Sequence, residues 1–97
     1  EIKVNDDSGN FIVTGVSENP KSSIINIFNN TEVRASIKMG GYNYIFEPYA
    51  SRDIDIAPGD YTIIVSSPNV IPFIEKVEIE VGKNYKRVYV ITKKLKN

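Results

Sequence analysis

Apolar and polar residues alternate with a period of two along most of this chain, and no stretch shows the longer period of an amphipathic helix. Successive side chains of a β-strand point to opposite faces, so this alternation predicts strands that are buried on one side. Gly, Pro or Asn interrupts the pattern at intervals of roughly 8 to 12 residues, which is the spacing of turns in a sandwich or barrel. The sequence therefore predicts an all-β domain.

The strand pattern covers residues 2–4, 11–16, 24–28, 33–39, 42–46, 53–56, 61–66, 76–81 and 85–92. The first two of these segments predict a hairpin across the polar residues between them. Gly40 and Gly41 predict a two-residue turn, because glycine accepts the positive φ that such hairpins need. The last segment has apolar residues on both faces and is expected in the middle of a sheet. Together they predict an antiparallel immunoglobulin-like or transthyretin-like β-sandwich of about seven to eight strands.

The composition excludes several kinds of chemistry. The chain has 97 residues with no Cys, no His and no Trp. Without Cys and His there is no disulfide, no thiol nucleophile, no imidazole base and none of the usual zinc or iron sites. We therefore predict a single β-sandwich domain over residues 1–97 that is not an enzyme, with no catalytic residues, no metal site and no cofactor.

The ends and the apolar runs of the chain bear on its origin. It begins at Glu1 rather than Met and carries no signal-like segment, so we expect a form processed or excised from a longer precursor. No apolar run approaches the roughly 20 residues that a membrane-spanning helix needs. The sequence therefore predicts no membrane span in this segment.

Charge is distributed unevenly although 12 basic residues balance 12 acidic ones. Acidic residues dominate residues 47–82, whereas residues 83–97 contain basic residues and no acid. A basic tail is one feature of proteins that bind nucleic acid or membranes. The preferred interpretation is that acidic and basic side chains face each other across neighbouring strands, which stabilises a sheet. We expect no nucleic-acid partner.

Aromatic residues provide the best candidate binding site. Tyr42, Tyr44 and Phe46 share one face of a predicted strand, and Tyr49 follows just beyond it. Rings in such a row can stack on a sugar, so Tyr42, Tyr44 and Tyr49 are candidate ligand-binding residues. The alternative is that the same stripe is the core face of its strand, since aromatic residues are ordinary in strands. The lack of tryptophan weakens the carbohydrate interpretation.

Three further motifs have a functional and a structural interpretation. Asp6, Asp7, Ser8, Gly9 and Asn10 could offer oxygens to calcium, but their spacing differs from that of an EF-hand and favours a polar turn. The polar cluster of Arg52, Asp53 and Asp55 near Glu47 could act as paired carboxylates, but a surface loop is preferred. The sequon Asn29-Asn30-Thr31 also fits a turn, which is preferred.

Residues 57–91 resemble a known family in their turns and strands. The similarity rests on Ala57-Pro58-Gly59-Asp60-Tyr61, Ile63, Val65, Pro72-Phe73, Val77, Ile79, Val81-Gly82-Lys83 and residues 88–91. This pattern is similar to the C-terminal half of PEGA-type domains and their relatives among prealbumin-like and carboxypeptidase-regulatory-like sandwiches. The resemblance implies a non-catalytic module of bacterial envelope or secreted proteins, lipoproteins included, in which it lies beside other domains.

Two functions remain open on these grounds. The first is a non-catalytic structural or protein-interaction module, located in the cell envelope or outside the cell, whose partner is another protein or a neighbouring domain of the same polypeptide. The second is a small carbohydrate-binding module that uses a tyrosine platform. Exposure of Tyr42 and Tyr44 separates them, because buried rings would leave the carbohydrate hypothesis without a site.

Overall fold

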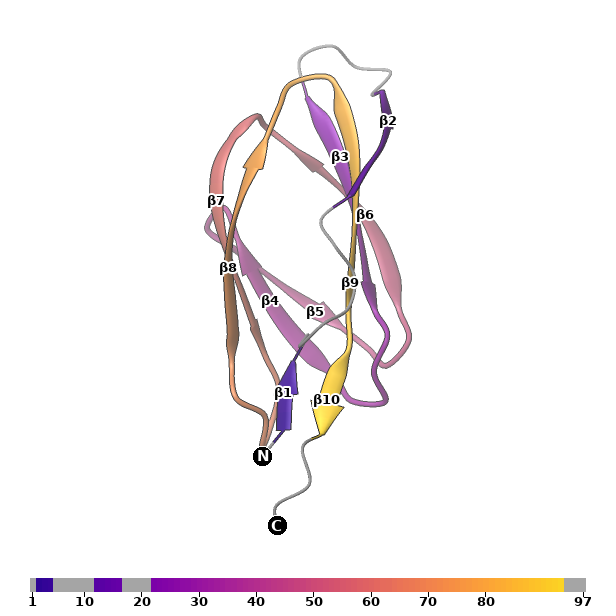
Figure 1. Ribbon diagram of the computed structural model, residues 1–97, viewed down its shortest axis with the longest axis vertical. Coiled ribbons are helices and arrows are strands. Elements are labelled where there is room, and N and C mark those ends of the chain that lie inside the picture. The colour runs from indigo at the N-terminus through magenta and orange to yellow at the C-terminus, as the bar shows by residue number, and fades with distance from the viewer. Residues whose placement is uncertain (1, 5–11, 17–21, 94–97) are drawn as a thin grey trace.

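The computed structural model of the chain describes residues 2–4, 12–16 and 22–93 (Figure 1). Within these residues eight strands form two four-stranded sheets that pack face to face, and two short strands form a separate ribbon at one end. The predicted β-sandwich is thereby confirmed. No helix in the described ranges is long and apolar enough to cross a membrane.

The two sheets are built from strands that alternate between the layers. The first sheet has the order β2 (Ile12–Val16), β9 (Lys83–Tyr89), β3 (Ser23–Asn29) and β6 (Ser51–Ile56). The second has the order β5 (Tyr42–Phe46), β4 (Ala35–Met39), β7 (Gly59–Ser66) and β8 (Phe73–Ile79). Neighbouring strands are antiparallel except for β3 and β9, which are parallel. Parallel neighbours need a long crossover, and the intervening strands provide it.

The N-terminal strands do not form the predicted hairpin with each other. Instead β1 (Ile2–Val4) pairs with β10 (Ile91–Lys93), and β2 pairs with β9. The N-terminal arm therefore runs antiparallel along the C-terminal arm. A polar run between two strands predicts a reversal or a loop, but it does not say which strand is the partner. Here β9 is bound by β3 on one side and is covered by β2 on the other.

Turn chemistry agrees with the observed connections. Gly40 and Gly41 have φ of 61° and 82° and join β4 to β5 as predicted. The expected turn at residues 57–60 is shorter, because Gly59, with φ of 144°, already begins β7. Tyr61 of β7 covers this connection and donates its hydroxyl hydrogen to the Ala57 carbonyl oxygen at 2.7 Å. The turn thus carries the chain from the first sheet to the second.

Inward-facing side chains of both sheets form one core. The first sheet contributes Ile25, Ile27, Ile54, Ile56, Tyr85 and Tyr89, and the second contributes Ala35, Ile37, Met39, Phe46, Ile63, Val65 and Ile79. Alternation along β7 places Ile63 and Val65 inward. β9 lies between β2 and β3, which confirms its expected central place.

Candidate functional site

The sandwich has a side where the edge strands β5 and β6 lie next to each other, called here the β5–β6 side. Its residues are Tyr42, Tyr44, Ile45 and Phe46 of β5 and Arg52 of β6. Both strands end their sheets in the strand order. This side contains two of the three predicted binding residues.

Exposure changes along the aromatic face of β5. Phe46 is 1% exposed and belongs to the core, Tyr44 is half-buried against the core, and Tyr42 is 69% exposed. The interpretation of this stripe as a core face is therefore right for Phe46 and wrong for Tyr42. The difference follows from position, because Phe46 lies beneath Arg52 whereas Tyr42 begins an edge strand beside the Gly40–Gly41 turn.

The rings of Tyr42 and Tyr44 are neighbours in a shallow recess. Their centroids are 6.1 Å apart and their planes are inclined by 40°. They line a hollow of about 160 Å³ together with Tyr61, Met39, Gly40, Ile54, Asp55, Ile56 and Ala57. Ligand pockets are usually about 300 to 1,000 Å³, so this recess suits contact with a surface group better than enclosure of a ligand.

Tyr49 lies elsewhere. It is 61% exposed, has φ of 58°, and its backbone N–H donates to the Thr31 carbonyl oxygen at 3.2 Å. Thr31 precedes β4, whose first residue Ala35 pairs with Phe46, the last residue of β5. Tyr49 is therefore at the opposite end of β5 from Tyr42. Tyr61, which the sequence did not single out as a binding residue, lines the recess with Tyr42 and Tyr44 instead.

Arg52 is held above the aromatic face of β5. The central carbon of its guanidinium lies 5.8 Å from the Tyr44 ring centroid and 5.2 Å from the Phe46 ring centroid. A nitrogen of the same group donates to the Ile45 carbonyl oxygen at 3.5 Å, which is long for a hydrogen bond. No ion pair within the described part of the chain includes Arg52.

A second arginine lies over two rings between β8 and β9, where it has a carboxylate partner. Arg87 is 4% exposed, and two of its nitrogens donate to the two carboxylate oxygens of Glu75, each at 2.8 Å. The Tyr89 hydroxyl also donates to Glu75, at 2.8 Å. The guanidinium carbon lies 4.9 Å from the Tyr89 ring centroid and 5.8 Å from that of Phe73. This cluster joins the two sheets.

The buried cluster changes the acid–base properties of its members. Burial alone would lower the pKa of Arg87, but the hydrogen bonds and charge of Glu75 outweigh it and raise this pKa. Burial raises the pKa of Tyr89 far above its usual range, and the charge of Glu75 adds to the effect. Sequence reasoning missed the cluster, although Arg87 stands between Tyr85 and Tyr89 on an otherwise buried face.

The predicted carboxylate cluster is divided between separate contacts. Asp53 accepts a hydrogen bond from the Asn26 side-chain amide at 2.7 Å on the first sheet. Glu47 forms an ion pair with Arg34 at 2.9 Å, beside the second sheet. Asp55 is exposed, between the inward-facing Ile54 and Ile56. The residues proposed as a calcium loop, Asp6 to Asn10, lie outside the described residues.

The sequon lies at the end of β3 and in the connection that follows this strand. Asn29 ends β3 and is 0% exposed, and its side-chain amide nitrogen donates to the carbonyl oxygens of Val33, Phe46 and Glu47 at 2.9, 3.3 and 3.0 Å. Thr31 donates its hydroxyl hydrogen to the Asn29 side-chain oxygen at 2.6 Å. The Asn29 side chain is therefore buried and hydrogen-bonded within the folded protein.

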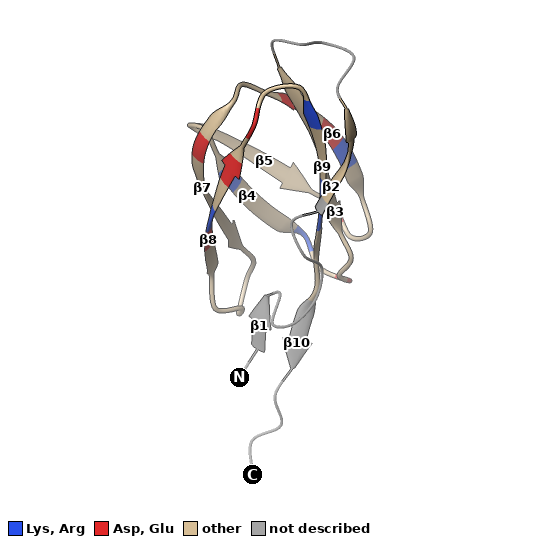
Figure 2. Ribbon diagram, turned by 45° about the horizontal axis from the view of Figure 1, so that its top comes forward, with Lys and Arg blue, Asp and Glu red and all other residues tan. Residues whose placement is uncertain are grey.

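Charged residues lie on strands of both sheets (Figure 2), and their ion pairs differ from the ladder pairing that the sequence suggested. Arg87 bonds to Glu75 across the sandwich, and Lys83 bonds to Glu80 within a turn, where this contact raises the pKa of Lys83. Neither pair consists of ladder neighbours. Asp60 and Glu78 do face each other across β7 and β8, and both are acidic. That ladder expectation is wrong for these residues.

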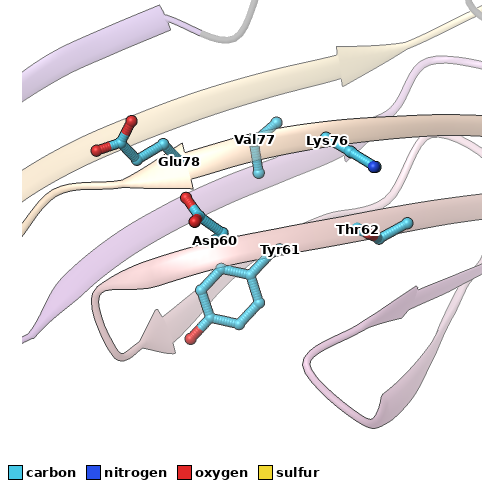
Figure 3. Close-up of a pocket in the computed structure, with 6 residues that line it drawn as sticks. All are labelled: Asp60, Tyr61, Thr62, Lys76, Val77 and Glu78. Carbon is cyan, nitrogen blue, oxygen red and sulfur yellow. The ribbon is translucent and has the colours of Figure 1, made fainter.

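A wider hollow of about 480 Å³ opens on β7 and β8 (Figure 3). Asp60 and Thr62 of β7 and Lys76 and Glu78 of β8 line it, together with Tyr61 and Val77. The four polar residues are all exposed, so the hollow is a groove of the solvated surface.

No known protein family matches the sequence. No curated protein matches it either.

Proposed function

We propose that this chain is a non-catalytic β-sandwich module that acts as a structural or protein-interaction domain, with its contact surface on the β5–β6 side. The observation that supports this function is the combination of an exposed Tyr42, a half-buried Tyr44 and an Arg52 with no described carboxylate partner. Tyrosine and arginine are the residue types enriched among the energetically dominant residues of protein interfaces.

The shape of this side agrees with contact to another macromolecule. The recess beside Tyr42 and Tyr44 is about 160 Å³, smaller than a usual ligand pocket. Ile45 is exposed on the opposite face of β5. A partner lying against β5 would cover apolar and aromatic area on both faces of the strand, which favours association.

The wider setting is part of the same proposal. The Pro58–Gly59 connection that leads to Tyr61 is one of the features on which the resemblance to PEGA-type and prealbumin-like sandwiches rests. A relationship to that group would place the module in the cell envelope or outside a bacterial cell, next to other domains.

Site-specific photo-crosslinking tests the contact surface. The protein is expressed in its native cells with a photoreactive phenylalanine analogue in place of Tyr42. The matched control carries the analogue in place of Thr62 on the outer face of β7. We expect a discrete protein adduct from position 42 and none from position 62. Equal crosslinking at both positions, or none at position 42, would contradict the proposal.

Carbohydrate binding is the second candidate, and the exposure of Tyr42 favours it. Titration with soluble polysaccharides, followed by the amide NMR signals of residues 40–52, tests it. Tyr42→Ala should abolish saturable shifts, whereas Tyr49→Ala, which removes a similarly exposed ring at the other end of β5, should retain them. Unchanged spectra across the panel would exclude this candidate for the glycans tested.

A further inference from the structure

We propose that β5 is an open edge that accepts an extended peptide strand, and that this strand supplies a carboxylate to Arg52. The inference rests on the proposed function, since it names the partner class of the β5–β6 side. The binding mode is the addition of a strand to an exposed sheet edge, in which backbone hydrogen bonds give affinity and alternate side chains give specificity.

The four edge strands of the two main sheets differ in how they are protected. Natural sheets guard their edges with charged residues or bulges. β6 and β8 contain charged residues in their sequences, SRDIDI and FIEKVEI. β2 contains an irregularity in its register between Val13 and Gly15. β5, with the sequence YNYIF, has neither protection, so it is the edge of these four that is most open to pairing.

The register of β5 shows which backbone groups are available. Met39 pairs with Tyr42 directly across the two-residue turn, so Tyr42, Tyr44 and Phe46 exchange hydrogen bonds with β4. The N–H and C=O groups of Asn43 and Ile45 therefore point away from β4. The contact to these groups in the described structure is the long one from Arg52 to the Ile45 carbonyl oxygen, which an incoming strand can replace.

Comparison of the two arginines indicates what Arg52 lacks. Each guanidinium lies over two aromatic rings, at 4.9 and 5.8 Å for Arg87 and at 5.2 and 5.8 Å for Arg52. Glu75 completes the Arg87 cluster with two hydrogen bonds. Arg52 has the rings but no carboxylate among the described residues. A carboxylate from a partner would complete a second cluster of the same kind.

Strand geometry places that carboxylate. Side chains directly opposite each other in a strand pair lie on the same face. A residue that pairs with Tyr44 therefore faces Arg52, and its neighbours in the peptide lie on the face of Asn43 and Ile45. The partner is thus an extended segment with a Glu or Asp opposite Tyr44. A second copy of this chain fits less well, because its β5 contains no acid and brings another Arg52.

A synthetic peptide tests the inference directly. The probe is an acetylated and amidated strand of about nine residues with the order Lys-Thr-Val-Thr-Glu-Thr-Val-Thr-Lys. One control peptide has glutamine in place of the glutamate. A second has proline in place of the two threonines that flank the glutamate, and it cannot pair as a strand. Binding to the full chain is followed by amide NMR shifts and by hydrogen exchange.

We expect saturable shifts and slower exchange at the amides of Asn43 and Ile45. The glutamate peptide should bind about tenfold more tightly than the glutamine peptide, because a bidentate charge-assisted contact is lost in the latter. Arg52→Gln should remove this difference. Lys86→Gln removes an equal charge from an exposed residue of β9 and should preserve it. The proline peptide should not bind.

Three results would overturn the inference. Equal binding of the glutamate and glutamine peptides would show that Arg52 does not bind the peptide carboxylate. NMR shifts that map to β8 or β2 would show that the peptide adds to another edge strand. Concentration-dependent shifts of Asn43 and Ile45 without peptide, with a doubled mass in sedimentation, assign the edge to a second copy. If any of these results is obtained together with a discrete crosslink from position 42, the peptide inference is wrong but the proposed interaction function is retained. Absence of that crosslink contradicts the proposed function itself.

Discussion

Asn29 joins separate segments of the chain through one buried side chain. Its amide nitrogen bonds to carbonyl oxygens that follow β3 and that end β5, and its oxygen accepts the Thr31 hydroxyl hydrogen. Ser23 has a similar role, donating to the Glu80 carbonyl oxygen at 2.6 Å. Buried polar groups are tolerated when they are hydrogen-bonded, so each of these side chains stabilises the connection that it bridges.

Asn29→Ala should lower the free energy of unfolding by about 2 to 3 kcal/mol, because buried carbonyl oxygens lose their donor. Urea denaturation followed by circular dichroism measures the change. Asn30→Ala is the control, since Asn30 is exposed and its backbone bond to Tyr89 does not need the side chain. Equal effects of the two substitutions would contradict the role of Asn29.

Tyr89 should make the protein sensitive to alkali. Its pKa is raised in the folded state, whereas in the unfolded chain it ionises near 10. The folded state then keeps a proton that the unfolded state releases, so the contribution of Tyr89 to stability is constant below about pH 10 and falls above it, by up to ~1.4 kcal/mol per pH unit. Denaturation at a series of pH values should show a smaller slope for Tyr89→Phe than for the unmodified protein.

Tyr42→Phe is the control for this slope, because it removes the hydroxyl of an exposed ring. It should retain the alkaline slope of the unmodified protein. An unchanged slope in Tyr89→Phe would show that another group is responsible.

At the scale of elements, the cluster of Glu75, Arg87 and Tyr89 holds the edge strand β8 against β9 of the other sheet. The pair of Glu75 and Arg87 is bidentate, and Phe73 packs edge-on against Tyr89 at 6.3 Å between centroids. Pairing across the layers thus sets how β8 docks. On the opposite side Arg52 lies over the rings of β5 without an ion pair to a described carboxylate.

Glu75→Gln should destabilise the fold by about 3 kcal/mol, because it leaves the buried Arg87 charge without its counter-charge. Replacing both residues together, as Glu75→Gln with Arg87→Met, should cost less than the single change. Urea denaturation of the three proteins forms the comparison. A double variant that is less stable than Glu75→Gln would show that the charge of Arg87 is not what the single change leaves exposed.

The turn between β4 and β5 gives a matched pair of glycines. A Cβ on Gly40 would lie 3.0 Å from a ring carbon of Tyr61, whereas one on Gly41 would meet open space. Both glycines have positive φ, so alanine at either site is strained by about 1 kcal/mol. Gly40→Ala should therefore lower the melting temperature more than Gly41→Ala. Equal decreases in melting temperature would show that the Tyr61 ring moves aside without destabilising the fold.

At the scale of the whole molecule, the chain crosses repeatedly between the two layers. β3, β6 and β9 belong to the first sheet, and the strands between them belong to the second. The β1 and β10 strands pair with each other at one end of the sandwich (Figure 1). Neither sheet therefore forms from a continuous segment, and each depends on the other to bury its apolar face.

Unfolding should therefore be one cooperative transition, as in most small single domains. Circular dichroism reports the loss of strands, and the fluorescence of the six tyrosines reports the loss of packing, since the chain has no tryptophan. The two urea curves should coincide. Separate midpoints would indicate independently folding parts and would contradict the prediction of a single domain.

Local pattern was sufficient for the strands and for part of the candidate site. Alternation predicted strands at residues 33–39 and 61–66, where β4 and β7 lie, and Gly40 and Gly41 predicted their turn. It grouped Tyr42 with Tyr44, which the structure confirms as ring neighbours. It also placed Tyr49 with them, because Tyr49 is close to them in the sequence. In the structure the length of β5 separates Tyr49 from Tyr42.

By itself, the sequence determined that this protein is all-β, where most of its strands lie and which faces are apolar, because these depend on the alternation of neighbouring side chains. Tertiary structure decided that β3 and β9 are parallel, that β1 pairs with β10, and that Tyr42 is exposed while Arg87 is buried. These properties depend on contacts between residues far apart in the chain. The alternation around a residue is the same whether its side chain is buried or exposed, and only the strand that packs against it decides which of the two occurs.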